Sequence, residues 1–393
     1  MKIAVIGGAL QGVEVAYLAR KAGIDVLLID RRSSVPASGL CGTFRQADVN
    51  DDAALDREMA DVDLIFPAIE SQKALSSLHS WALRHEVPIL HDPQAYAISA
   101  SKLESERFFR KFGVPVPATW PKCRFPVIAK PSYGSGSQGI RLFASADELR
   151  HVMGDDPAAA GWIVQEFIEG PTYSVEVIRN HGTSTAVQVT DLYMDDRYDC
   201  KRVAAPSVLS AASQKELIGI SLQMAENLDL EGIMDVEAVF SHGSFKVLEI
   251  DARFPSQTPI AVYFSCGINM VDVLVRDALG RNTASSLQQG HPARGVILEH
   301  IRVAPGSMVV TGEHAMAGGE SLKLRRDFFG ADEAITDYAD GKGRWVATSI
   351  CSGRNLNEAW ERRNASVSNI RRQFNIDRYV DSQPSRFDPE STT

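Results

Sequence analysis

The sequence predicts an α/β fold in which a parallel sheet comes first and an antiparallel region follows. Over the first 94 residues, short apolar runs alternate with helical stretches, which is typical of βαβ units. Further along, between residues 173 and 250, strand-like runs are joined by short turns. The composition is that of an ordinary globular protein, with 44% hydrophobic and 23% charged residues, and 393 residues suffice for two or three domains.

Charge and cysteine content limit the classes of function. The net charge of −9 argues against binding to nucleic acid or anionic lipid by electrostatic attraction. Only four apolar residues lie between Lys2 and Gly7-Gly8, so no secretory signal is expected, and no run reaches the ~20 apolar residues of a spanning helix. The five cysteines lack a C-x-x-C pair, as expected for reduced thiols. We expect a cytoplasmic protein that acts on small molecules.

The first domain is expected to span residues 1–94 and to be a Rossmann-like parallel α/β domain. Its first apolar run ends at Gly7-Gly8, and Gly23 ends the helix that follows. Strand, glycine turn, helix and strand together form one βαβ unit. The predicted elements are strands 2–6, 24–30, 63–68 and 87–90 and helices 11–22 and 72–86.

A second domain is expected over residues 95–290, with a smaller lobe at about 115–170, and an α+β part over 291–393 that completes the site. The hairpin turn is placed at His242-Gly243-Ser244, and the polar tail from Ser382 is expected to fray. The predicted helices are 99–112, 147–153, 213–227 and 356–373. The predicted strands are 126–130, 162–168, 173–178, 186–192, 234–240, 245–250, 296–303, 321–324 and 345–350.

The turn Gly7-Gly8-Ala9-Leu10-Gln11-Gly12 departs from the G-x-G-x-x-G turn of dinucleotide-binding proteins. Ala9 stands where the middle glycine would let the backbone approach a pyrophosphate. Asp30 ends the second strand, where such folds place a ribose-binding acid, but no hydride-transfer site is recognisable. Dinucleotide binding is therefore the least favoured interpretation, and two others stay open: a tight turn needed only for geometry, or a turn that touches another kind of ligand.

Lys130 ends an apolar strand and precedes a run of small residues, Ser132 to Gly139. Backbone N–H groups of such a loop can surround phosphate oxygens while the lysine supplies a point charge. No Gly-Lys-Ser/Thr follows, so it is not a Walker loop. On its own the loop is also compatible with a simple chain turn.

Carboxylates gather on the predicted hairpin. Glu249 and Asp251 share one face because side chains alternate along a strand, and the hairpin brings Glu237 roughly opposite. Three carboxylates on one face repel one another unless a cation lies among them, and such oxygen sets suit Mg²⁺ with nucleotide phosphates. Asp235 lies two residues before Glu237, so its side chain is expected on the same face and can join this group. The alternative is an exposed acidic sheet face.

Arg253 lies two residues after Asp251, so its side chain is expected on the same face as the acids. Ser256 and Thr258 add hydroxyl donors. An arginine beside metal-binding acids can bind a carboxylate or phosphoryl oxygens through bidentate hydrogen bonds. The alternative is that Arg253 simply pairs with the acids.

This order of elements resembles the ATP-grasp superfamily over most of the chain. The resemblance implies an ATP-grasp fold in which Lys102, in Ser101-Lys102-Leu103-Glu104, and Lys130 contact nucleotide phosphates. The hinge strand Gln165-Glu166-Phe167-Ile168 would hold adenine through its backbone, and Glu237, Glu249 and Asp251 would bind Mg²⁺. Relatives place a ribose-binding glutamate shortly after the hinge. Here Pro171-Thr172-Tyr173-Ser174 follows Gly170, which leaves Glu169 or Glu176 for that contact.

A more specific resemblance is to the ligases of pyrrolysine biosynthesis, which join 3-methyl-D-ornithine to L-lysine. It is carried by Gly7-Gly8-Ala9-Leu10-Gln11-Gly12, Pro67-Ala68-Ile69-Glu70-Ser71, Met234-Asp235-Val236-Glu237 and Leu248-Glu249-Ile250-Asp251-Ala252-Arg253-Phe254-Pro255-Ser256-Gln257-Thr258-Pro259. The resemblance implies that Leu10, Gln11 and Glu70 help hold lysine and that Asp30 approaches the nucleotide. Relatives can carry a lysine at the position of Ala9, so one nucleotide contact is in question here.

The predicted site residues fall into four groups. Arg253 and Lys130 are catalytic, and Glu237, Glu249 and Asp251 bind the metal. The predicted ATP-binding residues are Lys102, Lys130, Ser135, Gln165, Glu166, Phe167, Ile168 and Asp30. The predicted substrate-binding residues are Leu10, Gln11, Glu70, Ser174, Asp235, Arg253, Ser256 and Thr258.

The expected reaction is amide formation through an acyl phosphate, with ATP and Mg²⁺. The lysines and the cation neutralise charge on the transferred phosphoryl group, and the amine then attacks the acyl carbon. The amine must first lose a proton, which Glu70 or Asp235 can accept, and loop 133–139 is the natural lid. The rival predictions are another ATP-grasp ligase or carboxylase of purine or dipeptide synthesis and a non-catalytic nucleotide-binding regulator. The resemblance also allows a homodimer.

Overall fold

The computed structural model describes residues 1–134, 139–281, 291, 293–318 and 320–384. The chain forms two compact units. The terminal unit comprises Met1–His91, Lys201–Ser207 and Phe254–Asp381, and the central unit comprises Asp92–Cys200 and Val208–Arg253. Each unit contains its own share of the predicted site.

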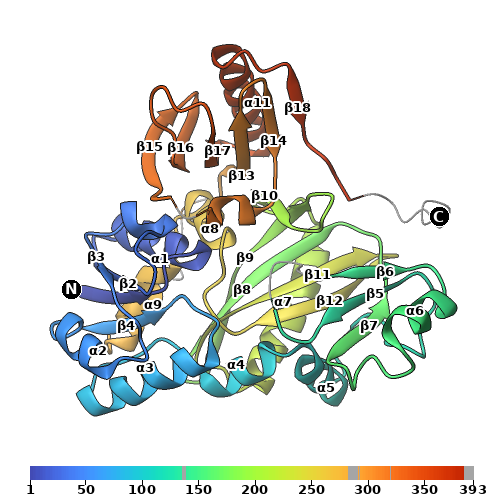
Figure 1. Cartoon of the computed structure of the whole chain (residues 1–393). Coiled ribbons are helices and arrows are strands. Elements are labelled where there is room, and N and C mark those ends of the chain that lie inside the picture. The colour runs from blue at the N-terminus through green and yellow to red at the C-terminus, as the bar shows by residue number, and fades with distance from the viewer. Residues whose placement is uncertain (135–138, 282–290, 292, 319, 385–393) are drawn as a thin grey trace. The chain divides into compact units, whose positions relative to one another are not determined.

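The terminal unit begins with a four-stranded parallel sheet, in blue in Figure 1, with strand order β3-β2-β1-β4. Its apolar strands are covered by helices that bury residues such as Leu78 and Trp81, so the sheet is buried as expected for a parallel arrangement. The elements are β1 (Lys2–Ile6), α1 (Leu10–Lys21), β2 (Asp25–Asp30), η1 (Pro36–Gly39), β3 (Thr43–Gln46), α2 (Asp52–Glu58), β4 (Leu64–Pro67) and α3 (Gln72–His85).

The remainder of the terminal unit is an antiparallel sheet with strand order β10-β13-β17-β16-β15, to which β14 and then β18 are added beside β13. An aromatic core around Trp345 and Phe328 lies under helix α11. The elements are β10 (Cys200–Ala205), α8 (Thr258–Cys266), α9 (Met270–Ala278), β13 (Gly295–Ala304), β14 (Ser307–Val310), η2 (Glu313–Ala317), β15 (Lys323–Phe328), β16 (Ala331–Thr336), β17 (Trp345–Gly353), α11 (Leu356–Gln373) and β18 (Arg378–Val380).

The central unit consists of two lobes. A three-stranded sheet of order β6-β5-β7 forms the smaller lobe, and antiparallel strands β12-β11-β8-β9 form the larger one. Helices α5 and α7 pack against the larger sheet through Phe108, Leu217 and Met224. The elements are α4 (Pro93–Ser99), α5 (Lys102–Phe112), β5 (Val127–Pro131), β6 (Arg141–Phe143), α6 (Ala146–Met153), β7 (Trp162–Glu166), β8 (Thr172–Asn180), β9 (Thr183–Met194), α7 (Ala211–Asn227), β11 (Gly232–Ser241) and β12 (Ser244–Asp251).

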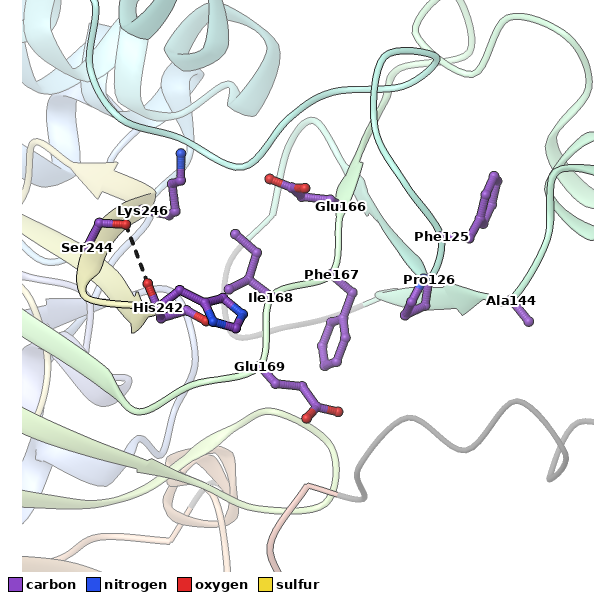
Figure 2. A pocket seen from close by; sticks show the side chains of 11 residues that line it. Phe125, Pro126, Ala144, Glu166, Phe167, Ile168, Glu169, His242, Ser244 and Lys246 are labelled. Atoms are coloured by element: carbon purple, nitrogen blue, oxygen red, sulfur yellow. Dashed lines mark hydrogen bonds between the residues drawn. The ribbon is translucent and has the colours of Figure 1, made fainter.

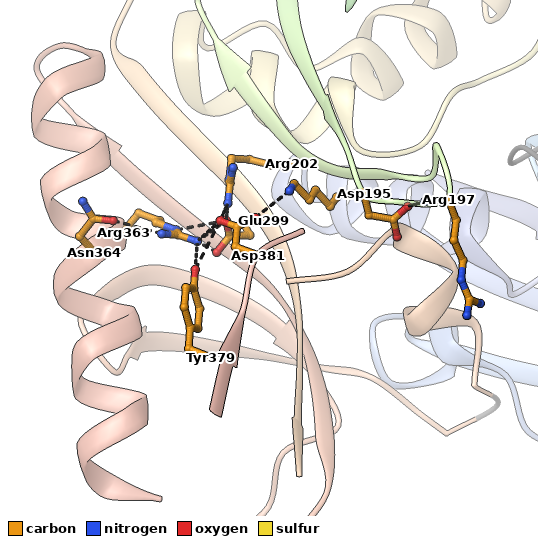
Figure 3. Close-up of polar contacts among 9 residues, drawn as sticks. Asp195, Arg197, Arg202, Glu299, Arg363, Asn364, Tyr379 and Asp381 are labelled. Carbon is orange, nitrogen blue, oxygen red and sulfur yellow. Dashed lines mark hydrogen bonds and ion pairs between the residues drawn. The ribbon is translucent and has the colours of Figure 1, made fainter. Parts of the chain in front are cut away.

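A buried cluster of charges joins the C-terminal strand to the terminal unit (Figure 3). The Asp381 carboxylate lies 2.7 Å from Lys201 Nζ and 2.6 Å from Arg202 Nη2. Arg363 donates to Glu299 and lies 3.3 Å from Asp381. Three cations thus share two acids, and only Asp381 has a side chain that is more than one-tenth exposed.

The α/β fold class is confirmed, and most predicted elements lie within two residues of their predicted bounds. Several predictions need correction. The helix placed at 99–112 begins at Lys102, because Ser99 ends α4 and Ser101 is the N-cap of α5. The strands placed at 186–192 and 345–350 are longer, at Thr183–Met194 and Trp345–Gly353. Residues 87–90 form only one bridge, between Ile65 and Ile89, because Pro88 removes a donor from the ladder. The strand placed at 321–324 is β15, at Lys323–Phe328. The sequence interpretation missed β3, α2, α4, β6, β10, α8, α9, β14, β16 and β18 and the short helices η1 and η2.

Among the described residues, no single helix is long and apolar enough to cross a membrane. The pair α8 and α9 passes such a test only when taken together, and these helices are bent by 98° relative to each other.

Candidate active site

The hairpin of β11 and β12 places the predicted metal-binding acids opposite one another. Its turn is His242-Gly243, and both residues have positive φ, of 50° and 80°, as a tight two-residue hairpin turn requires. Glu237 pairs directly with Glu249, and Asp235 pairs with Asp251. The prediction that Glu237 lies opposite the other acids is therefore correct.

A β-bulge lies between these pairs and the turn. Ala238 pairs with Val247, so Leu248 is an extra residue in β12. Before the bulge Phe245 and Val247 are buried, whereas after it Ile250 and Ala252 are buried. The bulge therefore exchanges the buried and outward-facing positions of the strand, so that Glu249 points away from the core. Bulges beside functional sites often redirect a side chain in this way.

Two lysines from different elements converge on Glu249. Lys102 opens α5, and its Nζ lies 3.2 Å from Glu249 Oε2 and donates to the Gly134 carbonyl at 2.8 Å. Lys130, at the end of β5, is close enough to Glu249 and Glu237 for their charges to act on it. The two lysines and two acids thus form one charged centre.

Burial and charge alter the pKa values of this centre. Burial lowers the pKa of Lys130, the charge of Glu249 opposes that shift, and the charge of Lys102 adds to it. Burial raises the pKa of Glu249, but the charges of Lys102 and Lys130 outweigh it and leave the pKa below the ordinary glutamate value. Burial also raises the pKa of Asp235 well above its usual range, and the charges of Asp251 and Glu237 raise it further.

Arg253 forms an ion pair with Asp251. The alternative that Arg253 pairs with an acid is therefore realised in this structure. With side-chain exposures of 16% and 17%, both groups lie at the edge of the centre rather than in open solvent. The guanidinium has five donors, so an ion pair with one carboxylate leaves it able to contact a second anion.

Strand β8 brings further polar side chains to the same sheet. Ser174 pairs with Glu237, and Glu176 pairs with Asp235. The Ser174 hydroxyl is buried and has no hydrogen-bond partner in the described part of the chain. Glu176 is fully buried, and its charge contributes to the raised pKa of Asp235. The sequence interpretation considered Glu176 only for a ribose contact, although its two-residue spacing from Ser174 places both on one face.

The predicted hinge strand lies beside a cavity of about 770 Å³ (Figure 2). The Phe167 N–H donates to Pro126 O, and the Glu166 N–H donates to Ala118 O, which fixes the hinge backbone. Gln165 is buried, and its amide donates to Glu106 at 3.3 Å. The cavity is lined by Phe125, Pro126, Ala144, Glu166, Phe167, Ile168, Glu169, Ser241, His242, Ser244 and Lys246. Ser135, predicted to bind ATP, lies outside the described residues.

The terminal unit places its predicted lysine-binding residues at one edge of the parallel sheet. Leu10 and Gln11 follow β1, and Glu70 follows the neighbouring strand β4. Carboxyl ends of adjacent parallel strands meet at the same sheet edge, where ligands of such folds bind. Gln11 is buried and Glu70 is exposed.

Atoms of neighbouring residues occupy the space beside the glycines of the Gly7–Gly12 turn. A Cβ added at Gly7, whose φ is +101°, would lie 2.5 Å from Ala68 O, and one at Gly8 would lie 2.3 Å from Val35 Cγ2. The Asp30 carboxylate accepts from the Gly8 N–H at 2.9 Å and pairs with Arg32. These contacts support the interpretation of a turn needed for geometry, and the nucleotide contact of Asp30 stays a prediction.

Ser256 and Thr258 lie at the start of α8 in the terminal unit. Ser256 Oγ donates to Glu313 Oε2 at 2.7 Å. Thr258 is the first residue of α8, and its hydroxyl has no hydrogen-bond partner among the described residues. The site residues thus form two groups, one in each unit: the charged centre with the hinge, and the sheet edge with the Ser256–Thr258 segment.

Known proteins resemble this chain in sequence and in fold. A family model described as an ATP-grasp domain matches residues 99–257. The 3-methyl-D-ornithine–L-lysine ligase of Methanosarcina mazei is 33% identical over 375 residues, which cover 95% of this chain and 96% of the relative. The ligase of that name from Methanosarcina acetivorans is 37% identical over 320 residues, covering 81% of this chain and 84% of the relative.

Solved structures show the same fold at low identity. The biotin carboxylase domain of Hydrogenobacter thermophilus 2-oxoglutarate carboxylase, determined with MgADP, matches with a TM-score of 0.73 at 15% identity over 93% of this chain and 89% of that one. The N5-carboxyaminoimidazole ribonucleotide synthetase of Thermotoga maritima matches with a TM-score of 0.64 at 20% identity, over 93% and 98% of the two chains.

The fold, the lysine and glutamate centre and the matching family model together define an ATP-grasp ligase. This confirms the resemblance expected from the sequence. Within that superfamily, the chain belongs to the family of 3-methyl-D-ornithine–L-lysine ligases, because it is 33% identical to a member along almost the whole length of both chains.

Proposed function

We propose that this chain phosphorylates the carboxylate of 3-methyl-D-ornithine with ATP and couples it to the side-chain amine of L-lysine, as in pyrrolysine biosynthesis. The observation that carries the reaction class is the convergence of Lys102 and Lys130 on Glu249, opposite Glu237. The substrate pair rests on the names of the relatives.

In this proposal the two lysines bind the phosphates of ATP. Each currently balances the charge of Glu249, so they supply positive charge where the γ-phosphoryl group is transferred. Burial lowers the pKa of Lys130, and the negative charge of a phosphate beside it would favour the protonated form.

The acids fit Mg²⁺. Hard cations take carboxylate oxygens, and four acids lie in register on this sheet face, with Glu237 opposite Glu249 and Asp235 opposite Asp251. Glu237, Glu249 and Asp251 would hold the ion, and when bound it would neutralise charge on the transferred group. On binding the ion, Glu249 would give up its ion pair with Lys102, and Asp251 would give up its ion pair with Arg253. Lys102 would then be available to the phosphates and Arg253 to the substrate carboxylate.

After phosphoryl transfer, the lysine amine attacks the acyl carbon and phosphate leaves, so that an amide, ADP and phosphate are formed. The amine has an ordinary pKa of about 10.4 and must lose a proton first. Asp235 is proposed to accept this proton, because it lies directly opposite Asp251 beside the charged centre. The hinge backbone is proposed to hold adenine.

The experiment that tests the proposal measures ADP release and product mass with candidate substrates. Methylornithine and lysine together are expected to support turnover and to give a product with the mass of their amide. Aminoimidazole ribonucleotide and D-alanine serve as comparison substrates. Turnover with only the comparison substrates would refute the proposed substrate pair while leaving the ligase class intact.

We also propose that the protein is a cytoplasmic homodimer. The sequence has five cysteines and no C-x-x-C pair, as expected for reduced thiols, and a biotin carboxylase domain of this fold is a dimer. Light scattering coupled to size exclusion would test the dimer, and a monomer at micromolar concentration would refute it.

A further inference from the structure

Helix α8 begins without the usual cap. Its N-cap residue, Gln257, makes no capping hydrogen bond and has φ +72° and ψ −56°. A positive φ is costly for a residue with a side chain and persists only where surrounding contacts enforce it. The start of α8 is therefore held in its conformation by something other than its own sequence.

Glu14 provides that contact. The Ile260 N–H, in the first turn of α8, donates to Glu14 Oε1 at 2.7 Å, and Glu14 is only 4% exposed. A carboxylate at a helix N-terminus satisfies a backbone donor that lacks an intrahelical partner and interacts favourably with the helix dipole. Glu14 thus caps α8 from another element.

Glu14 lies on α1, one turn after the predicted lysine-binding residues Leu10 and Gln11. A second hydrogen bond, from Asn269 Nδ2 to Leu18 O at 2.8 Å, ties the same helix to the start of α9. Helix α1 therefore fixes the segment Ser256–Thr258, and both belong to the terminal unit.

The segment that is held this way presents polar atoms to a ligand. Gln257 and Thr258 are 7% and 5% exposed, and neither Gln257 Oε1 nor Thr258 Oγ1 has a hydrogen-bond partner in the part of the chain that the structure describes. Buried polar atoms without partners are costly and rare in folded proteins. Their coincidence with a strained backbone indicates a binding segment.

We propose that Glu14 is a positioning residue for the amine substrate, L-lysine. By capping α8 from α1, it keeps the Ser256–Thr258 segment in register with Leu10 and Gln11, so that both elements hold one amino acid. This inference rests on the proposed function for the identity of the substrate. The competing explanation is that Glu14 only stabilises α8.

Steady-state kinetics with three variants test the proposal. Glu14→Ala removes the acceptor and is expected to raise the KM for L-lysine at least about fivefold, which is the fold-change equivalent of the stability that a lost helix cap typically costs. The KM for ATP is expected to stay unchanged within about twofold. Glu14→Asp is too short to reach Ile260 and is expected to behave alike. Glu14→Gln keeps an acceptor oxygen and is expected to rescue the KM for L-lysine.

The matched control is Asp51→Ala, which removes the acid that caps α2 through the Ala54 N–H. It is expected to lower stability without changing the KM for L-lysine. Equal changes in the KM values for lysine and ATP, or an unchanged KM for lysine in both Glu14→Ala and Glu14→Asp, would overturn the positioning role.

Hydrogen–deuterium exchange separates this inference from the proposed function. Amides of residues 257–261 are expected to exchange faster in Glu14→Ala than in the wild type, and unchanged exchange would overturn the positioning role. If the wild type shows no lysine-dependent turnover, the proposed substrate falls, while the exchange result still decides whether Glu14 holds the segment.

Discussion

At the residue scale, the candidate site is governed by charges that are taken out of water. Lys102 and Lys130 balance Glu249, whereas Asp235 faces Asp251, Glu237 and Glu176 with less compensation. An isolated buried charge costs several kcal/mol, so such a centre favours a ligand that brings the missing charges. ATP with a divalent cation brings both signs at once.

Glu249→Ala is expected to abolish most of the activity through the metal. Losing this ligand is expected to raise the Mg²⁺ concentration that gives half-maximal ADP release by at least about 10–100-fold. In other metalloproteins, mutating residues that only hydrogen-bond to a metal ligand already has an effect of this size. A Mg²⁺ titration at saturating substrates measures it. Glu231→Ala is the control, because Glu231 is exposed and lies 3.6 Å from Arg179. An unchanged Mg²⁺ requirement would contradict the metal role.

Asp235→Asn is expected to stabilise the metal-free protein at neutral pH. Because the folded pKa of Asp235 is raised, ionising it costs stability, and stability falls as pH rises from the ordinary value of about 3.9 through the folded value. The amide does not ionise, so its advantage is expected at pH 7 and to vanish near pH 3.5. We expect a gain of about 2 °C in Tm at pH 7.

Thermal unfolding in EDTA at both pH values measures this difference. Asp272→Asn, in the Asp272–Arg276 pair of α9, is the control and is expected to give no gain. An advantage of Asp235→Asn that is equal at the two pH values would show that Asp235 is not the source of the pH dependence.

At the element scale, a pair of serines sets the spacing between the two lysines. Ser101 caps α5 by accepting from the Glu104 N–H, and its hydroxyl lies 3.0 Å from Ser132 Oγ. The Lys102 N–H donates to Ser132 O at 2.8 Å. Lys130 lies two residues before Ser132, so these bonds join the start of α5 to the end of β5.

Ser132→Ala is expected to weaken ATP binding without affecting amino-acid binding. The substitution removes the hydroxyl bond to Ser101 and loosens the α5–β5 junction, with an expected three- to tenfold rise in the KM for ATP, equivalent to about 1 kcal/mol. Initial rates at varied ATP measure it. Ser210→Ala, which removes the cap of α7, is the control and is expected to leave the KM for ATP unchanged. Equal effects of the two variants would refute the junction role.

At the scale of the whole molecule, the last described strand completes a buried network in the terminal unit. Without Asp381, Lys201 would lose its 2.7 Å ion pair, and Arg202 and Arg363 would each lose one of the two acids that they contact. Burial raises the pKa of Asp381, but hydrogen bonds and charges from Lys201 and Arg202 more than offset this and lower it. Asp381, which directly follows β18, is therefore part of the folded core of the terminal unit.

Asp381→Ala is expected to destabilise the protein by about 3 kcal/mol, the typical cost of leaving a buried charge uncompensated. Since the folded pKa is lowered, the contribution of Asp381 is present above the ordinary value of about 3.9 and is lost as pH falls through the folded pKa. Urea unfolding at pH 7 measures the change. Glu358→Ala, on the exposed side of α11, is the control, and equal destabilisation by both would contradict the network's importance.

The sequence by itself determined the elements whose signals are local. Apolar runs, glycines and caps indicated β1, α1, β5, α5 and α11, and two-residue alternation with a turn predicted that Glu237 faces Glu249. The lysine before a small-residue loop and the paired acids were also readable, because phosphate and metal chemistry require those residue types. Short elements such as β10, β14 and β18 were missed because their pairing partners are distant in the chain.

Only the tertiary structure decided which side chains meet. The bulge at Leu248 determines that Glu249 leaves the core, and period-two counting from Val247 would bury it. The Glu14 contact with Ile260 spans 246 residues, and in the Asp381 cluster Arg202 and Asp381 are 179 residues apart. Such contacts leave no local pattern, because they depend on the packing of complete elements rather than on spacing along one of them.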